Sequence, residues 1–176
     1  LIGQLTNIHH QKLEEDRLRH EASTDLLTQL YNKITTEHLV SLELQEGRNH
    51  ALIVVDLDKF KYANDTFGHL FGDSVIKAVA ATLRATFRAT DIVGRTGGDE
   101  FVVLAKDISL SDGLETLKAK CRRLSVELAH VTLGQDYVIS ASIGISLFPR
   151  DGKTYAELFA KADAALYQIK NTGRGH

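Results

Sequence analysis

The sequence predicts an α+β fold in which helices flank a ferredoxin-like, palm-type sheet that is mostly antiparallel. Three observations lead to this prediction. The continuous apolar run at 51–56 is typical of a strand that is buried on both faces. Segments 91–96 and 101–106 have the composition of strands, and the tight turn between them makes them a β-hairpin. Elsewhere, apolar residues recur at helical spacing, which predicts helices with one apolar face.

The N-terminal part of the chain is expected to form two helices. Residues 1–22 are polar and charge-dense, and their few apolar positions fit a helical stripe only loosely. We interpret them as a linker or signalling helix, which is too short to distinguish a coiled coil from an exposed helix. The Ser, Thr and Asp at 23–25 offer caps for a second helix that ends near Gly47. The domain itself is expected to span 23–176.

The later elements alternate between strands and helices. The residues at 58–61 open a helix, and apolar residues continue helical spacing through 75–87. After the first helix the order is therefore β-α-β-β-α-β, followed by one more helix, as in a ferredoxin-like sheet. The elements expected after the hairpin are a helix over 114–128, a strand over 138–148 and a helix over 155–170.

Composition excludes several classes of function. The 176 residues carry a net charge of -2, so no basic field draws the chain onto a nucleic acid polymer. No apolar run approaches the roughly 18 residues of a membrane helix, so this segment is expected to make no membrane contact. The single cysteine, Cys121, is interpreted as a small buried side chain. Without a disulfide framework, a cytoplasmic location is expected, or the cytoplasmic portion of a membrane-anchored protein.

The chain starts at Leu1 and contains no methionine. We therefore expect it to be a piece of a longer protein. The missing part would hold a sensor domain upstream and, as a second option, another domain downstream.

Four acids mark one end of the predicted sheet. Asp56, Asp58, Asp99 and Glu100 fall at the end of a buried strand or at the hairpin tip, where we expect them to face solvent together. Converging carboxylates repel each other unless a cation lies between them, and hard oxygen ligands favour Mg²⁺ or Mn²⁺ over zinc. The alternative is that they are ordinary turn and cap residues.

Basic residues are expected near the same end. Lys61 lies in the first turn of the helix opened at 58–61, whose free N–H groups suit a phosphate. Lys170 and Arg174 follow the last helix and could reach back to a triphosphate. Basic residues at a helix C-terminus also simply compensate the helix dipole, so this alternative stays open.

The hairpin sequence Gly97-Gly98-Asp99-Glu100-Phe101 resembles the signature of the GGDEF family of diguanylate cyclases. The resemblance extends from about residue 22 to the last residue. The further matching segments are 25–32, 56–61, 64–69 with 72–73, 142–144, and 162–167 with Lys170 and 173–174.

This resemblance implies a metal-dependent enzyme that condenses two GTP into cyclic di-GMP and releases two pyrophosphates. The implied metal ligands, for Mg²⁺ or Mn²⁺, are Asp56, the backbone carbonyl of Leu57, Asp99 and Glu100. Asp99, Glu100 and Lys61 are implied to take part in catalysis. The implied GTP-binding residues are Phe60, Lys61, Asn64, Asp73, Gly97, Gly98, Lys170 and Arg174.

The implied guanine-binding pair makes chemical sense. The amide of Asn64 and the carboxylate of Asp73 can hydrogen-bond the edge of guanine, whereas adenine would leave Asp73 unpaired. Gly97 and Gly98 would let the hairpin backbone approach the nucleotide, because they carry no Cβ.

The resemblance also implies a homodimer and feedback control. Each domain of the family holds one GTP, so two domains must face each other and a monomer should be inactive. Arg88 and Asp91 match the Arg-x-x-Asp site at which many members bind their own product as an inhibitor. The alternative for these two residues is a surface salt bridge at a helix end.

Three positions depart from the family pattern, and two other functions are considered. Gln29 replaces the usual glycine, Lys33 a common arginine, and Thr96 a frequent aromatic residue. These changes bring the packing of the first helix and the turnover rate into question. The alternative functions are a catalytically silent module that senses GTP or cyclic di-GMP, and a nucleotide cyclase of the adenylyl type, which Asn64 and Asp73 argue against.

Overall fold

A computed structural model describes residues 22–109 and 111–172, so the helix expected over 1–22 lies outside them apart from residue 22. The core of the fold is a four-stranded sheet with the order β2-β3-β1-β4. Its strands are β1 (His50–Leu57), β2 (Ile92–Arg95), β3 (Glu100–Ala105) and β4 (Ala141–Phe148). All neighbouring strands are antiparallel, which confirms the predicted α+β fold class.

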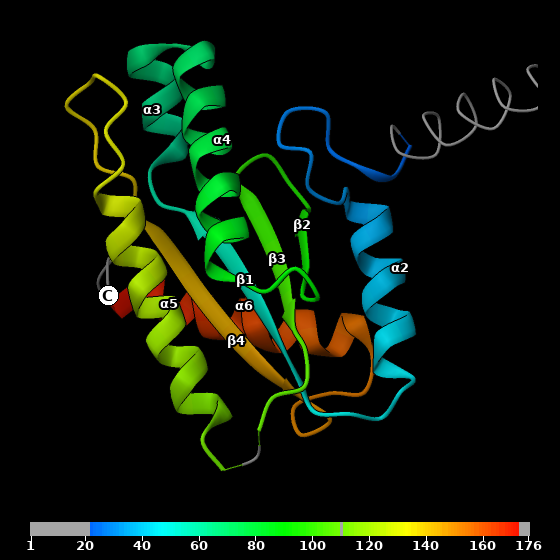
Figure 1. Cartoon of the computed structure of the whole chain (residues 1–176). Helices are drawn as coiled ribbons and strands as arrows, with labels where there is room; N and C mark the ends of the chain where they lie inside the picture. The colour runs from blue at the N-terminus through cyan, green and yellow to red at the C-terminus, as the bar shows by residue number, and fades with distance from the viewer. Residues whose placement is uncertain (1–21, 110, 173–176) are drawn as a thin grey trace, which may run out of the picture.

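Helices cover both faces of this sheet, as Figure 1 shows. The described helices are α2 (Lys33–Leu44), α3 (Phe60–Phe67), α4 (His69–Thr86), α5 (Gly113–Ala129) and α6 (Tyr155–Thr172). Successive side chains of a strand point to opposite faces, so β1 contributes to two separate apolar clusters. Ile53 and Val55 pack with residues of α4 and α5, whereas Leu52 and Val54 pack with residues of α2 and α6. The sheet is therefore the middle of three layers.

The first helix begins later than the sequence predicted. Asn32, not a residue of 23–25, is the N-cap of α2, and its side chain accepts the N–H of Thr35. Asp25 instead organises a turn, because its Oδ1 accepts both the N–H and the hydroxyl of Thr28. The same side chains that can cap a helix also stabilise turns, so the prediction chose the wrong local structure.

The structure shows the effect of one departure from the family pattern on the backbone. Gln29 lies inside this turn with φ of 59°, in the left-handed region that favours glycine. The turn is continuous with the sheet, since the backbone of Tyr31 forms a parallel bridge with Gly94. A residue with a Cβ therefore occupies a strained position here.

Two further boundaries differ from the prediction. The helical stretch after β1 is two helices, because Gly68, with φ of 87°, separates α3 from α4. β4 begins at Ala141 rather than at 138, because β1 ends at Leu57, which pairs with Ala141. Residue 138 has no partner in the sheet, and the Val138 side chain is 64% exposed.

Two predictions from composition can be compared with the described residues. Among them, no helix is both long and apolar enough to cross a membrane. Cys121 lies on the buried face of α5, and burial raises the pKa of its thiol to about 11. A thiol with so high a pKa is mostly protonated near neutral pH, which fits a packing role.

Candidate active site

The pairing of β1 with β3 brings three of the four predicted acids together. Asp56 lies opposite Glu100 in the antiparallel register. One residue further, the N–H of Leu57 donates to the carbonyl of Asp99 at 3.1 Å. Asp56, Asp99 and Glu100 therefore share one end of the sheet, and the backbone of Leu57 lies between them.

The Asp56 carboxylate is only partly compensated. The ammonium of Lys170, at the end of α6, lies 2.5 Å from its Oδ1. Burial raises the pKa of Asp56, and the nearby charges of Asp99 and Asp58 raise it further, although Lys170 opposes them. Negative charge therefore accumulates at this edge, as a cation site requires.

Asp58 does not face solvent with the other acids, contrary to the prediction. Its side chain is 6% exposed, and its Oδ1 accepts the hydroxyl of Ser142 at 2.8 Å. Its N–H donates to the carbonyl of Ser140, and its own carbonyl accepts the hydroxyl of Tyr137. Asp58 thus ties the turn after β1 to the segment that enters β4, which holds the neighbouring Leu57 carbonyl in place.

The hairpin turn is closed by its own backbone. The N–H groups of Thr96 and Gly97 both donate to the carbonyl of Glu100, at 3.0 and 3.3 Å. The hydroxyl of Thr96 also donates to the Glu100 carboxylate, with 2.6 Å between Oγ1 and Oε1. Glu100 is therefore held by both the main chain and the side chain of Thr96.

Arg95 is a site residue that the sequence reasoning missed. Its guanidinium donates to the carbonyl of Gly98 at 2.8 Å and to that of Gly97 at 3.1 Å. The same group binds the carboxylate of Asp25 at 3.1 and 3.2 Å. The available signal was an arginine two residues before the glycines, together with an aspartate in the first family segment.

The contact with Arg95 also affects the pKa of the Asp25 carboxyl. Burial raises the pKa of its carboxyl, but hydrogen bonds from Thr28 and Arg95 outweigh burial, and the pKa is lowered overall. The ionised form of Asp25 is therefore favoured in the folded protein. The turn at 25–30 and the hairpin are joined through one ion pair.

The start of α3 lies directly after this end of β1. Lys59 is its N-cap in the left-handed region, with φ of 54°, and it makes no side-chain capping hydrogen bond. The first N–H groups of α3 therefore have no side-chain acceptor, and Lys61 is exposed in the first turn. This arrangement suits an anion such as a phosphate.

The predicted guanine-binding pair lies where α3 meets α4. A Cβ at Gly72 would lie 1.9 Å from Oδ1 of Asn64 and 3.3 Å from the ring of Phe60. Only glycine therefore leaves room for the Asn64 amide at this point. Asp73 follows Gly72 directly, so the structure places the amide beside the turn of α4 that carries the predicted carboxylate.

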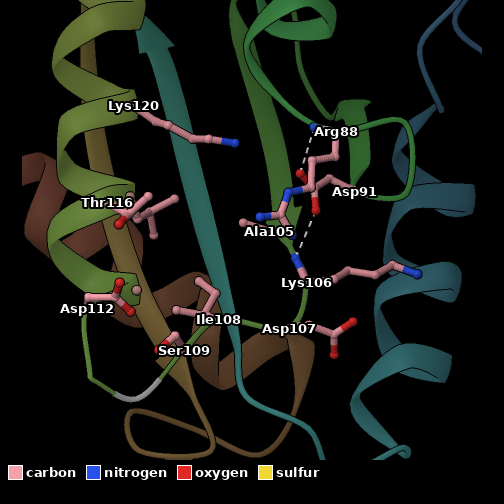
Figure 2. A pocket seen from close by; sticks show the side chains of 12 residues that line it. Arg88, Asp91, Ala105, Lys106, Asp107, Ile108, Ser109, Asp112, Thr116 and Lys120 are labelled. Carbon is pink, nitrogen blue, oxygen red and sulfur yellow. Dashed lines mark hydrogen bonds between the residues drawn. The ribbon is translucent and has the colours of Figure 1, made fainter.

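Arg88 and Asp91, the predicted inhibitory pair, lie away from the acids in the turn between α4 and β2. The Asp91 carboxylate accepts the N–H of Arg88 at 2.9 Å and the N–H of Lys106 at 3.0 Å. Figure 2 shows this turn beside a cavity of about 230 Å³, into which Lys120 extends from α5. No ion pair between the Arg88 guanidinium and Asp91 is found in the described part of the chain.

The donor set at the sheet end fits a magnesium-type ion. In the described ranges, no group of three or more His, Cys, Asp or Glu residues is close enough to hold a metal by itself. Mg²⁺ commonly keeps several waters and takes only one or two carboxylates plus substrate phosphates. Asp56, Asp99 and the Leu57 carbonyl match that mode. Arg174, expected at the triphosphate, lies outside the described residues.

Taken together, the antiparallel sheet with acids at one end defines a palm-type α+β domain. The chain belongs to the GGDEF family, since the family described as "Diguanylate cyclase, GGDEF domain" matches residues 22–176. It is 38% identical over 154 residues to the bifunctional diguanylate cyclase/cyclic di-GMP phosphodiesterase MucR of Pseudomonas aeruginosa. That match covers 85% of this chain and 22% of MucR.

Two other similarities bear on function. The chain is 35% identical to the cyclic di-GMP phosphodiesterase PdeR of Escherichia coli, over 99% of this chain and 26% of PdeR. It also resembles the coiled coil and GGDEF domain of DgcB from Caulobacter crescentus, solved in complex with c-di-GMP. That structure has a TM-score of 0.88 and 26% identity, covering 98% of this chain and 93% of that one. The chain thus spans about a quarter of the two curated relatives.

Proposed function

We propose that this domain is an active diguanylate cyclase that condenses two GTP into cyclic di-GMP. The observation that carries the proposal is the register of β1 against β3, which sets Asp56 opposite Glu100 with Asp99 beside them. Membership of a cyclase family supports it. The hairpin also retains both glycines and both acids of the family signature.

In the proposed reaction, the 3'-hydroxyl of one GTP attacks the α-phosphate of the other. A new bond forms between that oxygen and the α-phosphorus, the bond to the bridging oxygen breaks, and pyrophosphate leaves with its electron pair. The hydroxyl proton passes to a base, and Glu100 is one candidate for it. A second identical step closes the ring, so that two pyrophosphates are released for each cyclic di-GMP.

The residues of this chain would position the nucleotide. The free N–H groups at the start of α3, with Lys61, would bind the phosphates, while Asn64 and Asp73 would bind the guanine edge. Lys170 now pairs with Asp56, so it would exchange this carboxylate for a phosphate when the nucleotide binds. Arg174 is expected to join it.

The bound ion is proposed to be Mg²⁺ or Mn²⁺. Asp56, Asp99 and the Leu57 carbonyl would hold it, with Glu100 as a further ligand if it does not serve as the base. When bound, such an ion neutralises negative charge on the phosphates and orients them for transfer.

The active species is proposed to be a homodimer. One domain offers one set of nucleotide-binding residues, and the reaction needs a nucleophile and an electrophile on two GTP molecules that face each other. Specific activity should therefore rise with protein concentration.

The complete protein is expected to be longer, with a sensor domain upstream, and to work in the cytoplasm.

Product inhibition is proposed to act through Arg88 and Asp91. Arg88 is exposed, its guanidinium binds no described side chain, and it borders the cavity of Figure 2. Such a guanidinium can fork to a phosphate or stack on a guanine. We expect Arg88→Ala to weaken inhibition by cyclic di-GMP at least tenfold, because a charge-assisted contact is removed.

A second candidate is a catalytically silent module that binds GTP or cyclic di-GMP to regulate another domain. The similarity to PdeR favours it. That protein is named as a phosphodiesterase, although part of it matches 99% of this chain. The two candidates differ in one product. A silent module binds nucleotide and releases no pyrophosphate.

The deciding experiment strips bound nucleotide from the purified domain and incubates it with GTP and Mg²⁺ over a range of protein concentrations. Cyclic di-GMP is followed by chromatography and pyrophosphate by a coupled assay, with ATP as a parallel substrate. Cyclic di-GMP and pyrophosphate formed from GTP, with no reaction of ATP and no product in Asp99→Ala, would support the cyclase. GTP binding without pyrophosphate at any concentration would instead favour the silent module.

A further inference from the structure

Thr96 is one of the departures from the family pattern, and the proposed function assigns it no role. It directly follows β2, immediately before Gly97, in the turn that leads to both hairpin acids. Its hydroxyl donates to Oε1 of Glu100 at 2.6 Å, and its N–H donates to the carbonyl of the same residue at 3.0 Å. One residue therefore restrains the backbone and the side chain of Glu100.

The hydroxyl contact is of the stronger kind. A hydrogen bond from O–H to a carboxylate is typically about 2.5–2.7 Å long and roughly twice as strong as one between neutral groups. Threonine is also stiff at χ1, because two heavy atoms branch from its Cβ. The donor is thus held in place before it binds, and the contact restrains a glutamate side chain that would otherwise sample many rotamers.

The contact uses one oxygen of Glu100 and leaves the other for a ligand. In the described part of the chain, no hydrogen bond is found for Oε2 of Glu100. Asp99, the neighbouring acid, makes no side-chain hydrogen bond to the described residues and has one fewer side-chain torsion to fix. Of the two hairpin acids, the longer and more flexible one is the one that the turn restrains.

We propose that Thr96 is a positioning residue, whose hydroxyl holds the Glu100 carboxylate in the orientation that phosphoryl transfer requires. This inference rests on the proposed cyclase function and assigns a new role to a residue outside its binding set. The threonine at this position, where the family often has an aromatic residue, supplies a hydrogen-bond donor to Glu100.

A pair of substitutions separates the hydroxyl from the shape of the side chain. Thr96→Val keeps the branched shape and removes the donor, whereas Thr96→Ser keeps the donor and removes the methyl group. We expect kcat for cyclic di-GMP formation to fall roughly tenfold in Thr96→Val, the effect of losing one charge-assisted hydrogen bond. In Thr96→Ser it should stay within about threefold, and KM for GTP should change little in both variants.

A packing role predicts the opposite order. If Thr96 only fills space at the end of β2, valine would be tolerated and serine would lose both stability and rate. Thermal unfolding of both variants shows whether either loses its fold. Equal kcat in wild type and Thr96→Val, or equal damage in both variants, would overturn the proposal.

A second measurement keeps this inference separate from the proposed function. If the wild type binds GTP and makes no product, crystal structures of the wild type and both variants with a non-hydrolysable GTP analogue decide it. We expect one ordered Glu100 conformer in wild type and Thr96→Ser, and a moved or disordered one in Thr96→Val. An unchanged Glu100 in Thr96→Val would overturn the positioning role whether or not the domain is a cyclase.

Discussion

The two ends of β1 carry similar numbers of charged residues but pair them differently. At the C-terminal end, Asp56 meets one ammonium, that of Lys170, and shares its surroundings with Asp99 and Glu100. At the N-terminal end, where His50 opens the strand, acids and bases alternate. The first end accumulates unpaired negative charge, and the second is close to neutral.

Most polar atoms of the N-terminal cluster are paired within the chain, whereas Nε2 of His50 is buried without a hydrogen-bond partner among the described residues. Glu43 accepts from both Arg48 and Lys106, and Arg48 also binds Asp107. Nδ1 of His50 accepts the N–H of Asp107, and burial lowers the pKa of this imidazole. Such a cluster holds α2, β1 and the segment after β3 together, because most of its charges are paired with one another.

The difference teaches how to distinguish structural charges from functional ones in this domain. Charges that complete one another's hydrogen bonds hold elements together, as Glu43 does between α2 and the end of β3. Charges that remain incompletely compensated at a sheet end cost stability and are available to a ligand. Asp58 ties backbone segments together through its Oδ1, N–H and carbonyl, but its Oδ2 is buried without a partner among the described residues, beside the site.

The largest expected effect tests the open end of β1. Asp56→Asn should reduce cyclic di-GMP formation by on the order of a thousandfold, because the variant loses a carboxylate of the proposed metal site. Its folding stability near pH 7 should be equal to or above that of the wild type. Folding raises the pKa of Asp56, so its ionisation opposes folding at pH values above that raised pKa and not below the unfolded value.

Pyrophosphate release at pH 8, and thermal unfolding at about pH 3 and pH 8, measure these two effects, because about pH 3 lies below the unfolded pKa of roughly 3.9. The gain in stability of Asp56→Asn over wild type should be larger at pH 8. A variant that is inactive and also strongly destabilised would show that Asp56 supports the fold.

The second effect tests the clamp between Arg95 and Asp25. Arg95→Ala and Asp25→Ala should each destabilise the domain, with a coupling energy of about 1–3 kcal/mol in a double-mutant cycle. Arg95→Ala should also lower kcat, because the carbonyls of Gly97 and Gly98 lose their donor, and Asp25→Ala should lower it less, because Arg95 remains but loses its carboxylate partner. Chemical denaturation of the four proteins measures the coupling, and additive effects would refute the clamp.

The same pair predicts a dependence on acid. Folding lowers the pKa of Asp25, so its contribution is present above the unfolded value of about 3.9 and is lost as pH falls through the lower folded value. Asp25→Asn should therefore flatten the loss of stability below about pH 4. Melting temperatures from pH 2.5 to pH 6 would measure it.

The third effect tests the paired charges at the N-terminal end of β1, where we expect a loss of stability without a loss of activity. Glu43→Gln leaves Arg48 and Lys106 without their shared carboxylate, so we expect a loss of about 1–2 kcal/mol in the free energy of unfolding. For a domain of this size that is a fall of about 2–8 °C in the melting temperature. Pyrophosphate release should remain. Its loss would show that the charges at the N-terminal end of β1 also support activity, contrary to the distinction between the two ends.

The smallest effect concerns the strained turn. Gln29→Gly should raise the free energy of unfolding by up to about 1 kcal/mol, because glycine adopts positive φ without a Cβ penalty. Gln45→Gly is the matched control, since Gln45 is also exposed but has a right-handed φ of -69°. The control should be slightly destabilised. A loss of stability in Gln29→Gly would show that its contact with the Leu26 carbonyl outweighs the strain.

The sequence was enough to predict the sheet and most of the acid site. The apolar run of β1 and the glycine turn of the hairpin define strands by local pattern, and strand ends expose whatever acids follow them. Asp56, Asp99 and Glu100 could be placed together on that basis. The first helix was misplaced because Asp25 has the chemistry of a cap, and only its long-range contact with Arg95 shows that it serves a turn.

What the sequence determined by itself was therefore periodicity, the succession of strands and helices along the chain, and the residues at strand ends, since these follow from local spacing. Only the tertiary structure decided which partners the charged side chains meet. Asp58 is buried by Ser142 from β4, Asp56 meets Lys170 from the far end of α6, and Arg95 joins the hairpin to Asp25. These partners lie 84, 114 and 70 residues apart along the chain, beyond the reach of any local pattern.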